Sequence, residues 1–212
     1  MLMDVHLHTT KYSWCSNIDP QEAVKRALEL KLDGIVLVEH DVVWKPEEIL
    51  RLKEETGAGD LVILRGIEIS CNTKEGLRHG HLLSFGFYQA ANHYYRLCTE
   101  EVIAEVHRAG GVAIAAHPFR GGFGFGDDIY RLDLDAIEVY HPQHDPPKIR
   151  RAEQACQELN LPSTGGSDAH ELKEIGLHLT YFSNPIATEK ELVKEIKAKR
   201  CRPASPSELR GP

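Results

Sequence analysis

The sequence lacks several features that mark common protein classes. It has no apolar run long enough to cross a membrane, and its charged, histidine-bearing start does not resemble a signal peptide. Its 25 Lys and Arg residues are outnumbered by 32 Asp and Glu residues, so the net charge is -7 and no overall basic surface is available for tight binding to a nucleic-acid backbone. We therefore expect a cytoplasmic protein that does not bind membranes.

Signatures of covalent catalysis and of nucleotide binding are also absent. The sequence contains no GxSxG motif, and its five cysteines are scattered without a CxxC pair, which indicates reduced thiols and no disulfide framework. None of these cysteines has a local context that marks a nucleophile. The glycine-rich stretch FRGGFGFGDD from Phe119 lacks the Lys-Ser/Thr pair of a P-loop and is interpreted as a flexible loop near the site.

Short apolar runs instead alternate with amphipathic stretches along all 212 residues. Strands are expected at MDVHLH, GIVLVEH, LVILRGIEIS, HLLSFGF, GVAIAAH, AIEVYH, PSTGGSD and LHLTYFS. Helices are expected at residues 20–30, 46–56, 99–109, 146–159 and 188–199. This succession predicts a single α/β domain over residues 1–200 with a largely parallel sheet. Residues 201–212 contain few apolar side chains and are expected to form a mobile tail.

Polar side chains of the types that bind metal ions stand at the ends of these apolar runs. In chain order they are His6 and His8, His40, Glu68, His117, and Asp168 with His170. In a β/α barrel the carboxyl ends of the strands converge on one face, so these residues are expected to meet there. His81 is different because it begins its apolar run, and its placement depends on a strand direction that the sequence does not fix.

These residue types favour a metal centre over a Ser-His or Cys-His nucleophile. The spacing of two in HLH directs both imidazoles to the same face of a strand, where one cation can take both nitrogens. Glu68 stands in the otherwise apolar GIEIS, where an unpaired carboxylate would be costly, and its two oxygens can bridge two cations. Histidine and carboxylate ligands together suit two or three divalent ions, Zn, Mn or Fe, in a hydrolytic centre.

Seven motifs carry a resemblance to the PHP (polymerase and histidinol phosphatase) superfamily: DVHLHT, VEHD, GIEIS, HGHLL, AAHPFR, IEVYHPQHD and GGSDAH. They occur in that family's order and approximate spacing, from Asp4 to about Phe182. The resemblance implies a distorted (βα)7, TIM-like barrel around a di- or trinuclear metal site. It also implies three ligand groups: His6, His8, Glu68 and Asp168; Glu68, His81 and His117; and His40 with His170. Within HGHLL we prefer His81 to His79, because His81 joins the apolar run directly.

The chain departs from the family pattern at two places. Family members carry Asp or His shortly after HxH as a ligand of the third ion, whereas this chain has YSWCSN, with Trp14 near that position. Asn17 and Asp19 are not obvious replacements, and Asp19 is expected to cap the next helix. The third ion is accordingly weakly bound, differently ligated or absent. The second departure is VEHD for the usual TDHD, and we expect Glu39 and Asp41 to hold ligand imidazoles in place.

Arg120 and His141 are the candidates for contact with a substrate. Arg120 closely follows His117, where it could meet a phosphate, although a solvent-facing loop arginine fits the sequence equally well. His141 follows a strand end and could donate a proton to a leaving oxygen or contact the substrate. The predicted catalytic residues are therefore Glu68, Asp168 and His141.

Together these residues predict a metal-dependent phosphoesterase, a hydrolase acting on a small phosphomonoester. One alternative is a nuclease or nucleotide-trimming enzyme with the same centre, to which the basic residues Lys148, Arg150 and Arg151 on one expected helix lend little support. The other is a non-catalytic metal-binding module, which Trp14 in place of an acid would favour. The sequence does not determine the oligomeric state.

Overall fold

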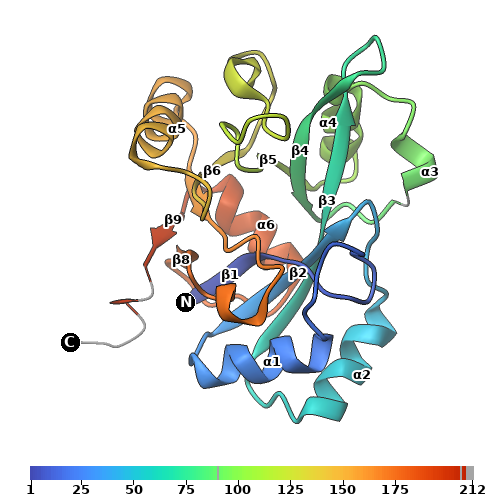
Figure 1. The fold of residues 1–212 in the computed structure, drawn as a ribbon, viewed down its shortest axis with the longest axis vertical. Helices are drawn as coiled ribbons and strands as arrows, with labels where there is room; N and C mark the ends of the chain where they lie inside the picture. The colour runs from blue at the N-terminus through green and yellow to red at the C-terminus, as the bar shows by residue number, and fades with distance from the viewer. Residues whose placement is uncertain (90, 206, 209–212) are drawn as a thin grey trace.

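A computed structural model of the chain describes residues 1–89, 91–205 and 207–208 (Figure 1). The strands of this part of the chain form one sheet in the order β7-β6-β5-β4-β3-β2-β1-β8-β9. They are β1 (Leu2–Leu7), β2 (Gly34–His40), β3 (Val62–Asn72), β4 (Arg78–Phe85), β5 (Val112–Ala115), β6 (Ala136–Tyr140), β7 (Ser163–Gly165), β8 (Leu179–Phe182) and β9 (Cys201–Ala204). Each of the eight expected runs overlaps one of the first eight strands, although β1, β3 and β4 extend beyond the expected bounds.

The helices lie outside the curved sheet, and α1 and α2 pack side by side (Figure 1). The α-helices are α1 (Pro20–Glu29), α2 (Pro46–Thr56), α3 (Ala91–Tyr94), α4 (Thr99–Arg108), α5 (Pro146–Leu159) and α6 (Glu189–Lys197). Two short 3-10 helices, η1 (Gly126–Tyr130) and η2 (Leu172–Glu174), connect strands. The sequence predicted the five longer α-helices but not α3, η1 or η2, which are too short to show a helical period.

Local sequence explains where the first helix begins and which face it buries. The Asp19 carboxylate accepts hydrogen bonds from the backbone N–H groups of Gln21 and Glu22, so it caps α1 as predicted. Pro20 occupies the first helical position, where a missing N–H costs nothing. Ala23, Val24 and Ala27 recur on the buried face of α1 and pack it against the sheet.

The sheet is mixed, whereas the sequence predicted a largely parallel one. The pairs β1–β2, β2–β3, β5–β6 and β6–β7 are parallel, but β3–β4, β4–β5, β1–β8 and β8–β9 are antiparallel. The alternation of apolar residues that marks a strand carries no information about its direction, which explains the difference. Because β4 runs against β3 and β5, its first residues lie at the same edge of the sheet as their last ones.

The sheet curves so that β7, at one end of the strand order, approaches β8 and the end of β1. Thr180 on β8 accepts a hydrogen bond through its hydroxyl from the N–H of Gly165 on β7 (3.0 Å) and donates one to the carbonyl of the same glycine (2.8 Å). Leu7 forms an isolated parallel bridge with Ala169, just after β7. These contacts close most of the gap, and the fold is the predicted single-domain, distorted α/β barrel.

The end of the chain differs from the prediction. Residues 201–204, expected to begin a mobile tail, form β9, which pairs with β8 in the register Phe182↔Cys201. Backbone pairing to an existing sheet edge overrides the low apolar content of this segment. The rest of the expected tail lies outside the described residues apart from 205, 207 and 208. Among the described residues no helix is both long and apolar enough to cross a membrane.

Candidate metal centre

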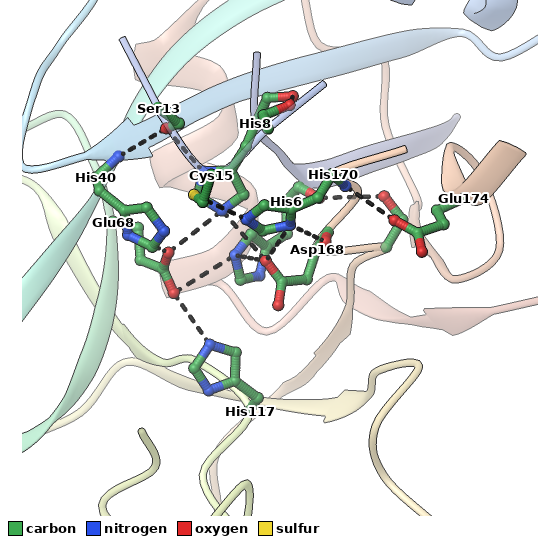
Figure 2. Close-up of polar contacts among 12 residues, drawn as sticks. His6, His8, Ser13, Cys15, His40, Glu68, His117, Asp168, His170 and Glu174 are labelled. Carbon is green, nitrogen blue, oxygen red and sulfur yellow. Dashed lines mark hydrogen bonds and ion pairs between the residues drawn. The ribbon is translucent and has the colours of Figure 1, made fainter. Parts of the chain in front are cut away.

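The predicted metal ligands meet at the end of the barrel where most of the strands finish (Figure 2). His6 lies on β1, and His8 directly follows that strand. His40 ends β2 and pairs with Glu68 in the parallel register of β2 and β3. Figure 2 shows seven of them pointing toward a common centre: His6, His8, His40, Glu68, His117, Asp168 and His170. The predicted convergence of these side chains is therefore present in the structure.

Glu68 lies at the middle of this cluster and is fully buried. Its Oε1 is 2.9 Å from His81 Nδ1 and 3.0 Å from His117 Nε2. Its Oε2 is 2.9 Å from His40 Nδ1 and 3.2 Å from His8 Nε2. Because each oxygen faces a different pair of imidazoles, this carboxylate is placed to bridge two ions.

Asp168 joins the ligands of β1 to the residues predicted to meet a substrate. Its Oδ1 lies 3.2 Å from His8 Nε2 and 3.3 Å from His6 Nε2. Its Oδ2 accepts hydrogen bonds from Arg120 (2.8 Å) and from His141 Nε2 (3.0 Å). One oxygen therefore faces the candidate ligands, and the other faces the candidate substrate residues.

The reversed direction of β4 brings His81 to the cluster. His81 pairs with Ser70 in the antiparallel β3–β4 register, two residues beyond Glu68, although it stands near the start of its own strand. His79 turns away, and its ring nitrogens contact Thr99 Oγ1 (2.6 Å) and Asp128 Oδ2 (2.7 Å). Of the two histidines in HGHLL, His81 is the one that reaches the candidate centre.

The ligand atoms form four overlapping groups, each with its atoms within 4.8 Å of one another. The groups are His6, His8, Glu68 and Asp168; His40, Glu68 and His81; His8, His40 and His170; and His117, His141 and Asp168. The first group is the one that the family resemblance implied. The other three groups differ from those that the resemblance implied. His40 lies near Glu68 as well as His170, and His117 lies near His141.

Unsatisfied buried atoms indicate that a positive ion fits between these side chains. His6 Nε2, His8 Nε2 and Glu68 Oε2 are buried, and although each lies near oppositely charged atoms, none of these contacts has the geometry of a hydrogen bond in the described part of the chain. A buried polar atom without a partner is costly, whereas a divalent ion would satisfy several of these atoms at once. The donor set of imidazoles and carboxylates is suited to Zn, Mn or Fe.

Two residues that the sequence analysis missed orient the histidines of HLH. The fully buried Glu138 on β6 accepts a hydrogen bond from His6 Nδ1 (2.9 Å) and another from the backbone N–H of His117 (2.8 Å). Ser13 Oγ lies 3.3 Å from His8 Nδ1. With Nδ1 engaged in this way, Nε2 of each ring is left to face the centre. Glu138 stands in the apolar run AIEVY, the same signal that identified Glu68.

Glu39 and Asp41 do not have their predicted contacts. Glu39 accepts hydrogen bonds from the backbone N–H of Thr9 (3.1 Å) and from Trp44 Nε1 (2.9 Å). Asp41 accepts hydrogen bonds from Ser70 N–H (2.9 Å) and from the Tyr94 hydroxyl (3.2 Å). Both acids therefore hold loops and neighbouring strands in place, because their side chains turn away from the imidazoles.

The charges of the buried side chains at the centre favour the binding of cations. Burial lowers the pKa of His8, but the nearby carboxylates of Asp168 and Glu68 outweigh it and raise that pKa to about 9. Burial also opposes the charge on His6, yet nearby carboxylates hold its pKa well above the usual value. Glu68 and Asp168 are buried as well, and the surrounding imidazoles keep the pKa of each well below its ordinary value. Both carboxylates are thus ionised and available to a divalent ion.

Two of these residues have an unusual backbone. His117 has φ = 30° and Asp168 has φ = 46°, in the left-handed region that non-glycine residues rarely occupy. Such conformations cost about 1–3 kcal/mol each and persist only where the surroundings impose them. For His117, the hydrogen bond from its N–H to Glu138 is one such constraint.

Arg120 and His141 line an open cleft of about 330 Å³ next to the centre. Asp168 and His170 line the same cleft, so it gives access to the candidate ligands. His141 Nδ1 accepts a hydrogen bond from the backbone N–H of Gln143 (3.1 Å), which leaves the proton of a neutral ring on Nε2. Arg120 is thus placed to meet an anion at the cleft, and His141 to act as a proton donor.

The stretch YSWCSN places Cys15, not Trp14, toward the site. The Trp14 side chain is 94% exposed, whereas Cys15 lines the cleft with its Sγ 3.2 Å from His170 Nε2. Asn17 contacts Glu171 at the surface. Cys15 was missed because the sequence does not show which way loop side chains point.

Comparisons with known proteins agree with this architecture. A family model described as PHP-associated matches residues 146–201. The uncharacterized protein MJ1587 of Methanocaldococcus jannaschii is 30% identical over 155 residues, which cover 68% of this chain and 84% of that protein.

Solved structures with low sequence identity share the fold. One is a protein from Bifidobacterium adolescentis provisionally named a metal-dependent phosphoesterase, with 22% identity, a TM-score of 0.62, and coverage of 93% of this chain and 96% of that one. Another is a two-domain protein from Bacteroides vulgatus containing a predicted PHP-like metal-dependent phosphoesterase. It has 17% identity and a TM-score of 0.67, and the match covers 97% of this chain and 64% of that one. A third is an amidohydrolase from Chromobacterium violaceum with bound sulfate and no metal, with 15% identity, a TM-score of 0.63, and coverage of 99% of both chains.

The fold and the cluster define a barrel protein with a buried His/Glu/Asp centre that could hold divalent ions. The chain belongs to the PHP superfamily, as its motifs predicted.

Proposed function

We propose that this protein is a metal-dependent phosphoesterase that hydrolyses small phosphomonoesters. The observation that carries the proposal is the double role of Asp168, which faces two candidate metal ligands with one oxygen and Arg120 with the other. A substrate phosphate that takes the place of Asp168 beside the Arg120 guanidinium would lie next to the candidate metal centre. The names of the fold neighbours from Bifidobacterium adolescentis and Bacteroides vulgatus support the same reaction class.

In this site divalent ions would supply an activated water and positive charge for the phosphate oxygens. The chain's own residues hold and orient the reacting groups. Glu138 and Ser13 fix the rings of His6 and His8, so that little reorganisation is needed when a substrate binds. Arg120 offers a planar pair of donors that matches the geometry of a phosphate.

His141 is the residue we assign to protonate the leaving oxygen. Its Nε2–H points to Asp168 Oδ2 at the edge of the cleft, where a bound phosphoester would lie. The ring is buried and its orientation is fixed by the Gln143 N–H, so it would deliver the proton from a defined position.

The nuclease alternative gains little from the basic residues of α5. Lys148 pairs with Asp145, and Arg151 pairs with Asp127 and stacks on Phe119. Basic side chains already paired within the chain contribute less to binding a phosphate backbone. The non-catalytic alternative rested on Trp14 standing in place of an acid; its side chain points into solvent and does not line the cleft.

A panel of substrates tests the proposal directly. The protein would be incubated with small phosphomonoesters and with a 5′-phosphorylated oligonucleotide, each with added Mn, Zn or Co, and inorganic phosphate and oligonucleotide length would be measured. We expect metal-dependent release of phosphate from one or more monoesters. Shortening of the oligonucleotide without monoester turnover would favour the nuclease, and silence on every substrate would favour the non-catalytic module.

A further inference from the structure

Cys15 is held in place by a loop that is fixed on both sides. Before it, Ser13 Oγ accepts a hydrogen bond from the backbone N–H of His40 (3.3 Å). After it, Ser16 Oγ donates to the carbonyl of His8 (3.0 Å), and the Asn17 N–H donates to the carbonyl of His170 (2.8 Å). The loop is therefore tied to the segments that carry three of the histidines.

The ring of His170 turns its lone pair toward this cysteine. His170 Nδ1 donates a hydrogen bond to the carbonyl of Asp168 (2.8 Å), which places the proton on Nδ1. Nε2 is then free to bind an ion, and it lies 3.2 Å from Cys15 Sγ. Nitrogen and sulfur ligands of one tetrahedral zinc ion lie about 3.5 Å apart, given bond lengths of about 2.0 and 2.3 Å.

A separate observation indicates a ligand at the same place. The nitrogens of His8, His40 and His170 lie within 4.8 Å of one another, and this group contains no carboxylate. The His8 ring is fully buried between the other two, at centroid distances of 4.5 and 4.6 Å, and its Nε2 has no hydrogen-bond partner among the described residues. An ion at this group would lack the negative ligand that neighbouring groups provide.

We propose that Cys15 supplies this negative ligand as a thiolate, so that the third ion is held by Cys15 together with His170, at the side of the His8, His40 and His170 group. The inference rests on the proposed function, since it concerns an ion of the same centre. A thiolate ligand selects Zn, Co or Fe(II) over Mn and Mg, because soft sulfur binds the former more strongly. Cys15 would then take the place of the acid that the sequence lacks after HLH.

Cobalt titration of the full chain tests the thiolate ligand without any assay of activity. Sulfur bound to Co(II) gives a charge-transfer absorption band in the near ultraviolet. We expect this band in the unmodified protein and in Cys201→Ser. In Cys15→Ser the band should be lost, and the protein should bind about one equivalent less cobalt. Cys201 is the control because it is also partly buried but lies on β9, away from the cleft. Cys15→Asp should keep the ion, lose the band and bind Mn more strongly.

A second measurement avoids any variant that fails to fold. In the unmodified protein, zinc should protect Cys15 from alkylation, as read by peptide mass, and leave the labelling of Cys201 unchanged. A band that persists in Cys15→Ser, the absence of a band in the unmodified protein, or labelling of Cys15 that zinc does not slow would each overturn the proposal. If the band is present but no phosphoester is hydrolysed, the proposed function fails and the Cys15 ligand stands. If a phosphoester is hydrolysed but the band is absent, the proposed function stands and the Cys15 ligand fails.

Discussion

At Glu138 one buried carboxylate positions two predicted ligands. It accepts hydrogen bonds from the ring of His6 and from the backbone of His117, so its loss would free both groups. We expect Glu138→Gln to weaken metal binding by roughly 10–100-fold, the usual effect of removing a partner of a ligand imidazole. Chelator competition measures this affinity, and Glu158→Gln on the exposed face of α5 is the control. Unchanged affinity in Glu138→Gln would show that His6 needs no such partner.

Arg120 separates binding of substrate from binding of ions. Its guanidinium contacts Asp168 and lines the cleft, but it is not a metal ligand. Arg120→Ala should lower kcat/KM for a phosphomonoester by roughly 10–100-fold, the cost of one charge-assisted hydrogen bond, while ion content stays the same. Arg150→Ala, a charge loss on exposed α5, should have no effect. If Arg120→Ala has the same kcat/KM as Arg150→Ala, Arg120 does not contribute to substrate binding.

Single residues were predictable where chemistry conflicts with the local pattern. Glu68 stood out as a charge inside an apolar run, and the same reasoning applied to AIEVY would have found Glu138. Cys15 could not be found in this way, because the direction of its side chain depends on contacts of Ser13, Ser16 and Asn17 with distant segments.

Among the elements, the strands and longer helices were predictable, but their directions were not. The placement of His81 was left open for this reason, and the antiparallel β3–β4 register resolves it. Likewise, pairing with β8 turns a segment of low apolar content into β9. Long-range pairing decides both features, and a one-dimensional pattern does not encode it.

The turn after β7 passes very close to β1, and a substitution there tests this packing. A Cβ at Gly166 would collide with His6 Cβ and would lie 2.7 Å from Glu138 Oε1. Gly166→Ala should therefore displace His6, reduce the number of bound ions and lower the free energy of unfolding by about 1–3 kcal/mol.

The matched control is Gly121→Ala, since a Cβ at Gly121 would have no neighbour within 4 Å and the residue does not need a positive φ. Ion counting and thermal unfolding of the two variants provide the comparison. Equal ion content in Gly166→Ala and the unmodified protein would contradict the placement of this turn.

At the scale of the whole molecule, ion binding should be coupled to proton release. The ion-free site holds a proton on His8, whose pKa is about 9, and the pKa of His6 is also raised. An ion must displace these protons, so metal affinity should rise as the pH increases toward 9. Calorimetry in two buffers of different ionisation enthalpy would measure the protons released near pH 7. Binding without proton release would show that these imidazoles are not ligands.

The barrel itself was predictable because its motifs are spread over most of the chain and most of them, though not HGHLL, lie toward the end of a strand. What the family pattern could not supply was the division of ligands among ions. His40 and His117 contact partners outside their implied groups, which reflects side-chain packing at the end of this particular barrel.

The most direct test of the central claim is phosphate release by protein that has been stripped of metal and reloaded with increasing amounts of Zn, Mn or Co. If the cluster around Glu68 and Asp168 is a phosphoesterase centre, hydrolysis of a phosphomonoester should be absent without metal and should rise with loading to a plateau at two or three ions per chain. Asp168→Ala should stay at background throughout. Phosphate release that is independent of added metal, or equal in Asp168→Ala, would contradict the assignment.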